Sequence, residues 1–233
     1  MTRREEIAAN LAAVRARIER ACAAAGRDPD EVTLVVVTKF FPASDVRLLA
    51  DLGVRHVGEN RHQEAVLKAA ECHDLELTWH FVGGLQTNKA GPVTGYAHVV
   101  ESVDRVKLAT ALDRGAQAHE RELDVLVQVS LDPPDRTAGR SGVDPAGLAE
   151  LAAHIEGLAS LRLRGLMAVA PLGADPVQAF AELASIRAKL LRAHPGAGWL
   201  SAGMSGDLEA GVAAGATHVR VGSAVLGQRP EIK

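Results

Sequence analysis

The sequence predicts an α/β fold, a single (β/α)8 TIM-type barrel preceded by an N-terminal helix. About eight short apolar runs alternate with helical sequence along the 233 residues, and this alternation is typical of parallel βα units. The length suits one barrel. No linker, repeat or low-complexity tract interrupts the chain, so we expect one domain over residues 1–233. An open doubly wound sheet has the same order of elements and is the structural alternative.

The first element is an amphipathic helix that Gly26 brings to an end. Four apolar residues fall on one stripe of this helix: Ile7, Leu11, Val14 and Ile18. A β-branched run then occupies residues 33–38, between two prolines. Because this run is too apolar for a half-exposed strand, we expect a buried parallel strand.

Helical and strand-like segments alternate from there to the end of the chain. Further strands are expected at 55–58, 79–82, 97–100, 123–129, 161–167, 198–201 and 218–221. Helices are expected at 43–51, 103–119 and 208–214, with a short helix that begins at Thr87. With the first run, the chain supplies the eight strands that a closed barrel requires.

Composition and charge restrict the class of protein. The net charge is −3 and the pI about 6.3, so nucleic acid is not an expected partner. Cys22 and Cys72 form neither a disulfide framework nor a zinc-binding spacing, which indicates free thiols in a reducing compartment. No signal peptide is recognisable, and no apolar run approaches the roughly 18 residues that cross a bilayer. We therefore expect a cytoplasmic protein with no membrane partner. We also expect a monomer.

Lys39 is the first candidate for chemistry. In such a barrel the active site lies at the carboxyl ends of the strands, and Lys39 directly follows the first apolar run. The other five lysines lie in helical or terminal sequence. Partial desolvation lowers the pKa of an amine and makes it a nucleophile toward an aldehyde, which predicts Schiff-base chemistry. The alternative is a lysine whose stem covers the strand end while its ammonium reaches water.

Two glycine-rich turns after the last two strands indicate a phosphate site. Ser205 lies in the turn before the helix at 208–214, and Gly222 and Ser223 follow the final strand. Small residues expose backbone N–H groups to an anion, and the loops after strands seven and eight form the recurrent phosphate site of such barrels. Alternatively, Ser205 or Asp207 caps the helix and the glycines only turn the chain.

Other polar residues lie within strands or at their ends. Arg220 lies inside the last strand, where an inward guanidinium needs an acceptor, either a ligand or a buried carboxylate. Glu59 and Asn60 follow the second strand, and Glu59 is a candidate partner for an arginine. The histidines have no ligand-like spacing, so no metal is predicted.

Six ordered motifs resemble the pyridoxal 5'-phosphate homeostasis protein family. They are VVTK at 36–39, GENRHQE at 58–64, WHFVGGLQTNK at 79–89, LRGLM at 163–167, GMS at 203–205 and VRVGS at 219–223. The match runs from the first helix to Gly227-Gln228-Arg229, which is nearly the whole chain. Departures from the family pattern occur at Gly84, Thr87 and Ala202.

The resemblance implies a barrel similar to the N-terminal domain of alanine racemase, with pyridoxal 5'-phosphate held as an aldimine on a lysine. The cofactor-binding residues that it implies are Lys39, Asn60, Ser205, Arg220, Gly222 and Ser223. Lys39 would form the aldimine, and Arg220 would face the pyridine nitrogen. The phosphate would lie at the two serines and Gly222, and Asn60 would lie close to the cofactor. None of the three departures affects these positions.

Two functions fit such a site. A non-catalytic carrier would hold or buffer the cofactor and pass it to apoenzymes, whereas a racemase-like enzyme would act on amino acids. An arginine opposite the ring nitrogen keeps that nitrogen unprotonated and weakens the electron sink that carbanion chemistry uses. A racemase also needs a second base, and the only tyrosine, Tyr96, precedes the fourth strand. We therefore predict the carrier. A phosphosugar isomerase, which would not need Lys39 to bind an aldehyde, is a third class.

Overall fold

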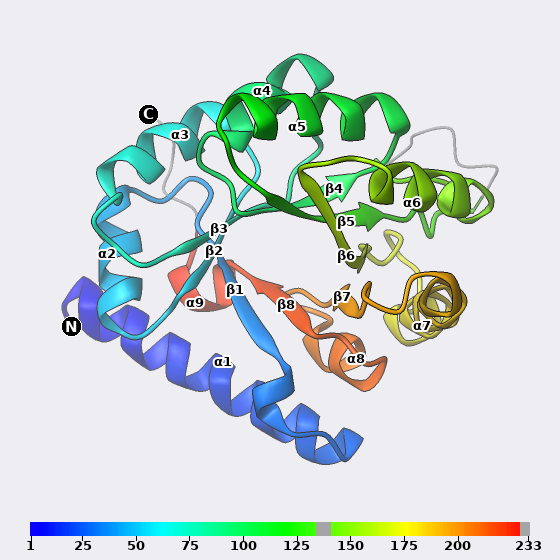
Figure 1. Cartoon of the computed structure of the whole chain (residues 1–233). Helices are drawn as coiled ribbons and strands as arrows, with labels where there is room; N and C mark the ends of the chain where they lie inside the picture. Colours follow the sequence, from blue (N-terminus) through cyan, green and yellow to red (C-terminus); the bar gives the residue numbers. More distant parts are fainter. Residues whose placement is uncertain (134–140, 229–233) are drawn as a thin grey trace.

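Eight parallel strands close into a barrel in sequence order (Figure 1). The structure, a computed structural model, describes residues 1–133 and 141–228. The strands are β1 (Thr33–Val37), β2 (His56–Glu59), β3 (Thr78–Phe81), β4 (Val99–Val103), β5 (Leu123–Gln128), β6 (Leu161–Met167), β7 (Trp199–Ser201) and β8 (His218–Val221). Strand β1 pairs with both β2 and β8, and Val35 lies opposite Arg220. This closure confirms the predicted barrel and excludes the open sheet.

Helices surround the barrel (Figure 1). They are α1 (Arg3–Ala25), α2 (Ala43–Asp51), α3 (His62–Glu71), α4 (Ala90–Thr94), α5 (Val106–Ala118), α6 (Leu148–Glu156), α7 (Pro176–Ala193), α8 (Leu208–Ala213) and α9 (Ser223–Leu226), with short 3-10 turns η1 (Pro29–Glu31), η2 (Thr87–Lys89) and η3 (Pro145–Gly147). The short helix expected from Thr87 is η2, which continues into α4. Arg229, the last residue of the resemblance, lies outside the described residues.

The predicted N-terminal helix is α1. Its expected stripe is buried, and Thr2 and Glu5 form a capping box at its start, which satisfies backbone donors that a helix cannot satisfy itself. The helix packs against α8 and α9, and Arg3 donates from Nη2 to Asp45 at 2.6 Å and to the Leu226 carbonyl at 2.9 Å. Helix α1 therefore ties the first βα unit to the last, beside the strand pair that closes the barrel (Figure 1).

Several predicted boundaries are shifted by one to three residues, and Glu59, expected after the second strand, is the last residue of β2. The largest difference concerns the fourth strand. The strand expected to end at residue 100 extends to Val103, and α5 begins at Val106 instead of residue 103. Glu101 and Ser102 resemble the polar end of a strand, yet both are fully buried. The strand continues through Glu101 because the interior of the barrel offers its carboxylate hydrogen-bond donors, His80 and Ser201.

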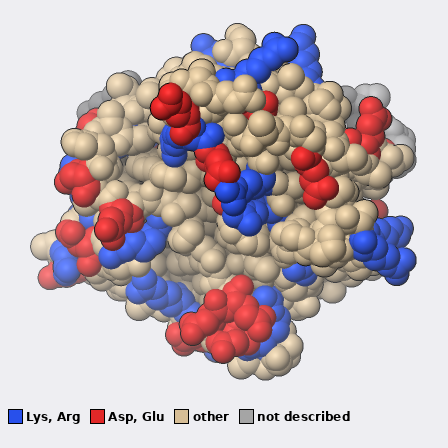
Figure 2. Space-filling model, in the orientation of Figure 1, with Lys and Arg blue, Asp and Glu red and all other residues tan. Residues whose placement is uncertain are grey.

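The surface carries charges of both signs. Acidic and basic side chains are interspersed over the face that Figure 2 shows. Cys22 and Cys72 are buried free thiols. None of the helices within residues 1–133 and 141–228 combines the length and apolarity needed to span a bilayer.

Candidate functional site

The carboxyl ends of the strands surround a cavity of about 460 Å³. This cavity is lined by all six residues that were predicted to bind the cofactor: Lys39, Asn60, Ser205, Arg220, Gly222 and Ser223. They come from β8 and from the segments that follow β1, β2, β7 and β8. Apolar side chains complete much of the wall, among them Val37, Phe41, Val82 and Val169. The barrel thus gathers one amine, one guanidinium and two hydroxyls around a single space.

The backbone beside Lys39 is held in an unusual conformation. Phe40 has a φ of 70°, which non-glycine residues adopt only where their surroundings impose it. Its N–H donates to Glu64 Oε2 at 3.1 Å, and the Arg61 guanidinium lies 5.0 Å from the centroid of its ring. The chain therefore turns sharply after β1, and this turn leaves Lys39 half-buried in the cavity wall.

A buried ion pair supports the same turn. Lys68 Nζ donates to Glu59 Oε1 at 2.6 Å and to the Thr38 carbonyl at 2.7 Å, and the Thr38 hydroxyl donates to Glu59 Oε1 at 2.6 Å. Burial raises the pKa of the Glu59 carboxyl, and Lys68 opposes that effect. The predicted pairing of Glu59 with an arginine is wrong, because the long Lys68 side chain reaches the carboxylate from α3 while Arg61 stays at the exposed surface.

Asn60 lies against the third strand loop. Gly83 allows this approach, since a Cβ on Gly83 would lie 2.5 Å from the Asn60 carbonyl oxygen. The side-chain Oδ1 of Asn60 is buried and has no hydrogen-bond partner among the described residues. A buried acceptor is costly unless a donor reaches it. This atom therefore indicates a polar ligand or water in the cavity.

The two glycine-rich turns meet at their serines. The hydroxyls of Ser205 and Ser223 are 3.4 Å apart. Gly203 has a φ of 95°, which starts the first turn, and the Met204 N–H closes it by donating to Asp207 Oδ1 at 2.5 Å. Asp207 occupies the N-cap position of α8 without a side-chain capping bond. Asp207 therefore stabilises the turn and does not cap the helix, whereas Ser205 lines the cavity.

Arg220 lies between the cavity and a buried carboxylate. Its guanidinium lines the cavity on one side. On the other side it donates to the Ala168 carbonyl at 2.9 Å and to Ser201 Oγ at 2.5 Å, and Glu101 Oε2 lies 3.7 Å away. Burial lowers the pKa of Arg220 and the Glu101 carboxylate opposes the change. The buried charge is therefore compensated within the barrel, as buried ions must be.

Comparison with known proteins identifies the family. The family of the alanine racemase N-terminal domain matches residues 9–230. A pyridoxal phosphate homeostasis protein of Mycobacterium leprae is 43% identical over an alignment of 240 positions. The alignment covers 97% of this chain and 93% of that protein. The chain belongs to the pyridoxal phosphate homeostasis protein family. The resemblance of the six motifs is thereby confirmed.

Solved structures agree with this family assignment. PipY of Synechococcus elongatus, solved with pyridoxal phosphate bound, is 38% identical, with a TM-score of 0.83 over 95% of this chain and 100% of PipY. An alanine racemase of Clostridium difficile gives a TM-score of 0.73 at 13% identity and covers 97% of this chain but 57% of the racemase. The likeness to the racemase is therefore one of fold alone.

The sequence pattern did not indicate three residues that lie behind the cavity. His80, Glu101 and Ser201 are buried inside strands and connect to Arg220. One signal was available, because Glu101 interrupts a run of valines as Arg220 does in the last strand. Two opposite charges in strand interiors of one barrel predict a pair. In this member of the homeostasis protein family, Glu101 and Arg220 are recognised as partners only once the closed barrel is known.

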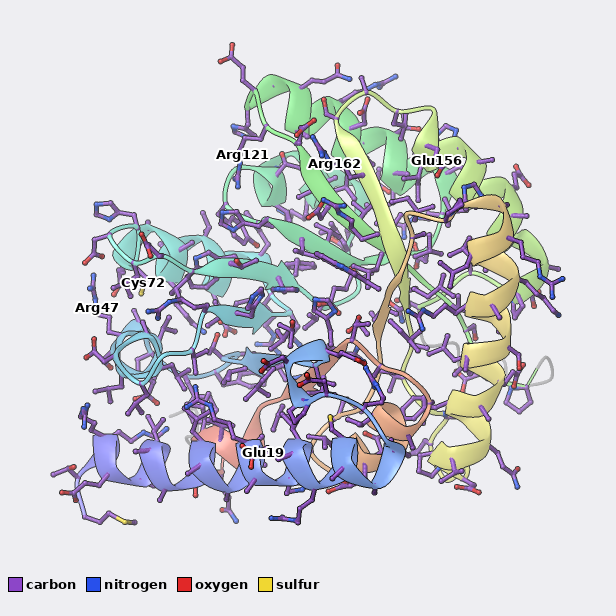
Figure 3. All side chains as sticks on the ribbon, turned by 60° about the horizontal axis from the view of Figure 1, so that its bottom comes forward. Glu19, Arg47, Cys72, Arg121, Glu156 and Arg162 are labelled. Carbon is purple, nitrogen blue, oxygen red and sulfur yellow. The ribbon has the colours of Figure 1, made fainter. Side chains whose placement is uncertain are left out.

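The only tyrosine of this family member lies elsewhere. Tyr96 stacks on His62, with ring centroids 5.9 Å apart, in a second cavity of about 1030 Å³. Cys72 and Arg121, labelled in Figure 3, line the same cavity. Burial raises the pKa of Tyr96. Neither Lys39 nor any other of the six residues lines this larger cavity, so its size does not make it the site of the predicted chemistry.

The buried pair Glu59–Lys68 yields a stability prediction. Lys68→Met should lower the free energy of unfolding by about 3 to 5 kcal/mol, because it leaves a buried carboxylate without its partner. Adding Glu59→Gln should recover part of the loss, since the unpaired charge is then gone. Urea unfolding of both single variants and the double variant measures the coupling. Strictly additive losses would show that the two side chains are not coupled.

Proposed function

We propose that this protein binds pyridoxal 5'-phosphate in the 460 Å³ cavity and carries or buffers it without catalysing amino-acid chemistry. One observation carries the proposal: an amine, a guanidinium and two serine hydroxyls from distant segments line one space. The names of the relatives and the ligand of PipY support it. We propose that residues 1–233 are one domain and that its barrel carries this site.

The residues present fit the chemistry of this cofactor. When bound, pyridoxal phosphate supplies an aldehyde that reacts with amines and, in enzymes, an electron sink for carbanions. Lys39 would bind the aldehyde carbon covalently through Nζ, as the amine at the end of β1. Asn60 would use its unpartnered Oδ1 to accept a hydrogen bond from the ligand or from water that accompanies it.

The phosphate end of the cavity would be the paired serines. Ser205 and Ser223 bring two hydroxyl donors together, and Gly222 adds a backbone N–H without a side chain to block access. Hydrogen bonds to a charged acceptor are about twice as strong as neutral ones. These residues would therefore hold the phosphate while Lys39 holds the other end of the ligand.

The surroundings of Arg220 favour a carrier over an enzyme. A guanidinium facing the pyridine nitrogen would keep that nitrogen unprotonated, which weakens the electron sink. The second base of a racemase is also not supplied by Tyr96, which lines the other cavity. A racemase-like activity is the alternative, and the third experiment below decides between them.

We further propose that the protein is a cytoplasmic monomer and that apoenzymes dependent on pyridoxal phosphate receive the cofactor from it. The two buried free thiols fit a reducing compartment. Lys39 alone is enough to exchange the ligand with an incoming amine, because transfer from one amine to another needs no carbanion.

Lys39 is expected to be the residue that binds the aldehyde. The protein mixed with pyridoxal phosphate should absorb visible light, and borohydride should remove the colour and leave a pyridoxyl mass on the peptide containing Lys39. Lys39→Ala should lose the visible band, and Lys107→Ala, at an exposed lysine, should keep it. Finding the mass on Lys68 or Lys89 would refute the assignment.

The paired serines should contribute to affinity in part. Ser205→Ala and Ser223→Ala should each weaken binding of pyridoxal phosphate by about 1 to 3 kcal/mol, because a charged partner loses a hydrogen bond while the backbone contacts stay. Fluorescence or absorbance titration gives the Kd. Ser185→Ala, at an exposed serine of α7, is the matched control. An unchanged Kd in both cavity variants would place the phosphate elsewhere.

The protein should show no appreciable racemisation, transamination or decarboxylation. General acid–base catalysis is worth about 10² to 10⁴ in rate, and a site that lacks the second base forfeits much of this. The measurement is loss of α-deuterium from labelled L- and D-alanine and other amino acids, with an alanine racemase as positive control. Exchange at enzyme-like turnover that Lys39→Ala abolishes would establish the racemase-like alternative.

A further inference from the structure

A line of buried polar side chains crosses the interior of the barrel. His56 Nδ1 lies 3.0 Å from His80 Nε2, and His80 Nδ1 lies 2.7 Å from Glu101 Oε1. Ser201 Oγ donates to Glu101 Oε2 at 2.6 Å, and Arg220 Nη1 donates to Ser201 Oγ at 2.5 Å. These residues belong to β2, β3, β4, β7 and β8, so five strands contribute to one hydrogen-bonded line.

Glu101 accepts both of its hydrogen bonds in this line, one through each carboxylate oxygen. Burial by itself would raise the pKa of Glu101, but the bond from His80 and the charge of Arg220 lower it to about 2. An ionised carboxylate only accepts hydrogen bonds, so His80 Nδ1 carries a proton. Burial holds the pKa of His56 at about 4, so His56 is neutral near pH 7 and one proton lies between the two rings.

Glu101 is also the counterion of Arg220. Arg220 is 5% exposed and Glu101 is fully buried, so solvent screens the attraction between their charges little. The other groups whose charge acts with Arg220 are the Asp207 carboxylate, in the turn before α8, and the His218 ring on β8. Burial keeps the pKa of His218 at about 4, which leaves it neutral. Glu101 therefore dominates the charge balance behind the cavity.

We propose that Glu101 is a positioning residue of the cofactor site, which orients Arg220 through Ser201 and sets the positive potential at the place of the pyridine ring. The inference rests on the function proposed above. Because Glu101 does not line the cavity, it acts on the site through the orientation of Arg220 and through the electrostatic effect of its charge. The line also reaches the opposite end of the barrel, where His56 borders a separate cavity of about 350 Å³.

The charge of Glu101 is tested with Glu101→Gln, which keeps the shape of the side chain and one acceptor oxygen but removes the charge and replaces the other oxygen with an N–H donor. Loss of the negative charge makes the cavity more positive, so a protonated group on the bound ligand should lose its proton more readily. The pH at which the visible absorbance of the loaded protein is half lost should fall by about 1 unit. Glu122→Gln, at an exposed carboxylate, should not move this pH.

The orientation of Arg220 is tested with Ser201→Ala, which keeps both charges and removes only the bridging hydroxyl. Pyridoxal phosphate should bind about 3- to 10-fold more weakly, as expected for the loss of one hydrogen bond to a charged group, while the pH midpoint stays near that of the wild type. A purely structural role for Ser201 would lower stability in urea without changing the Kd.

The outcomes separate the inference from the proposed function. If the wild-type protein binds pyridoxal phosphate on Lys39 but folded Glu101→Gln keeps the wild-type pH midpoint, the role of Glu101 is refuted and the proposed function stands. If Glu101→Gln does not fold, an unchanged Kd in Ser201→Ala refutes it equally. If the wild-type protein does not bind pyridoxal phosphate, both proposals fail.

Discussion

The buried charge of Arg220 constrains the whole interior of the barrel. A guanidinium does not lose its proton at any physiological pH, so its burial requires acceptors and a counterion. The acceptors are the Ala168 carbonyl at the end of β6 and Ser201 on β7, and the counterion is Glu101 on β4. The pairing of β6, β7 and β8 brings Ala168 and Ser201 to Arg220, whereas Glu101 on β4 faces it across the closed barrel. The counterion of Arg220 therefore depends on closure of the sheet.

The cavity mouth is shaped by contacts that do not themselves line it. Glu64 and Arg61 hold Phe40 in its left-handed conformation, and the pair Glu59–Lys68 holds Thr38. Both fix the short segment that carries Lys39. A side chain whose backbone is fixed during folding loses less conformational freedom when a ligand arrives. This arrangement favours binding of a small molecule at the cavity mouth.

The relation to alanine racemase shows why function is argued from the site. The two folds agree over nearly the whole of this chain, yet the likeness covers little more than half of the racemase. Racemisation by two bases needs a base on each face of the substrate, and carbanion chemistry on an amino acid needs an electron sink. The cavity described here combines one amine with an arginine that a carboxylate holds from behind. This set of groups supports the carrier that we propose over the racemase-like alternative.

The sequence by itself determined the order of elements and most of the cavity wall. Alternating apolar runs indicated the barrel, and residues at or after strand ends supplied five of the six selected residues that line the 460 Å³ cavity, with Arg220 inside the last strand as the sixth, because parallel strands deliver their carboxyl ends to one side. The tertiary structure decided the partners. Lys68 reached Glu59 from α3, and Glu101 stayed in a strand because His80, Ser201 and Arg220 lay across the barrel. Local pattern records which residues are buried, whereas the pairing of buried charges depends on distances between strands that are far apart in sequence.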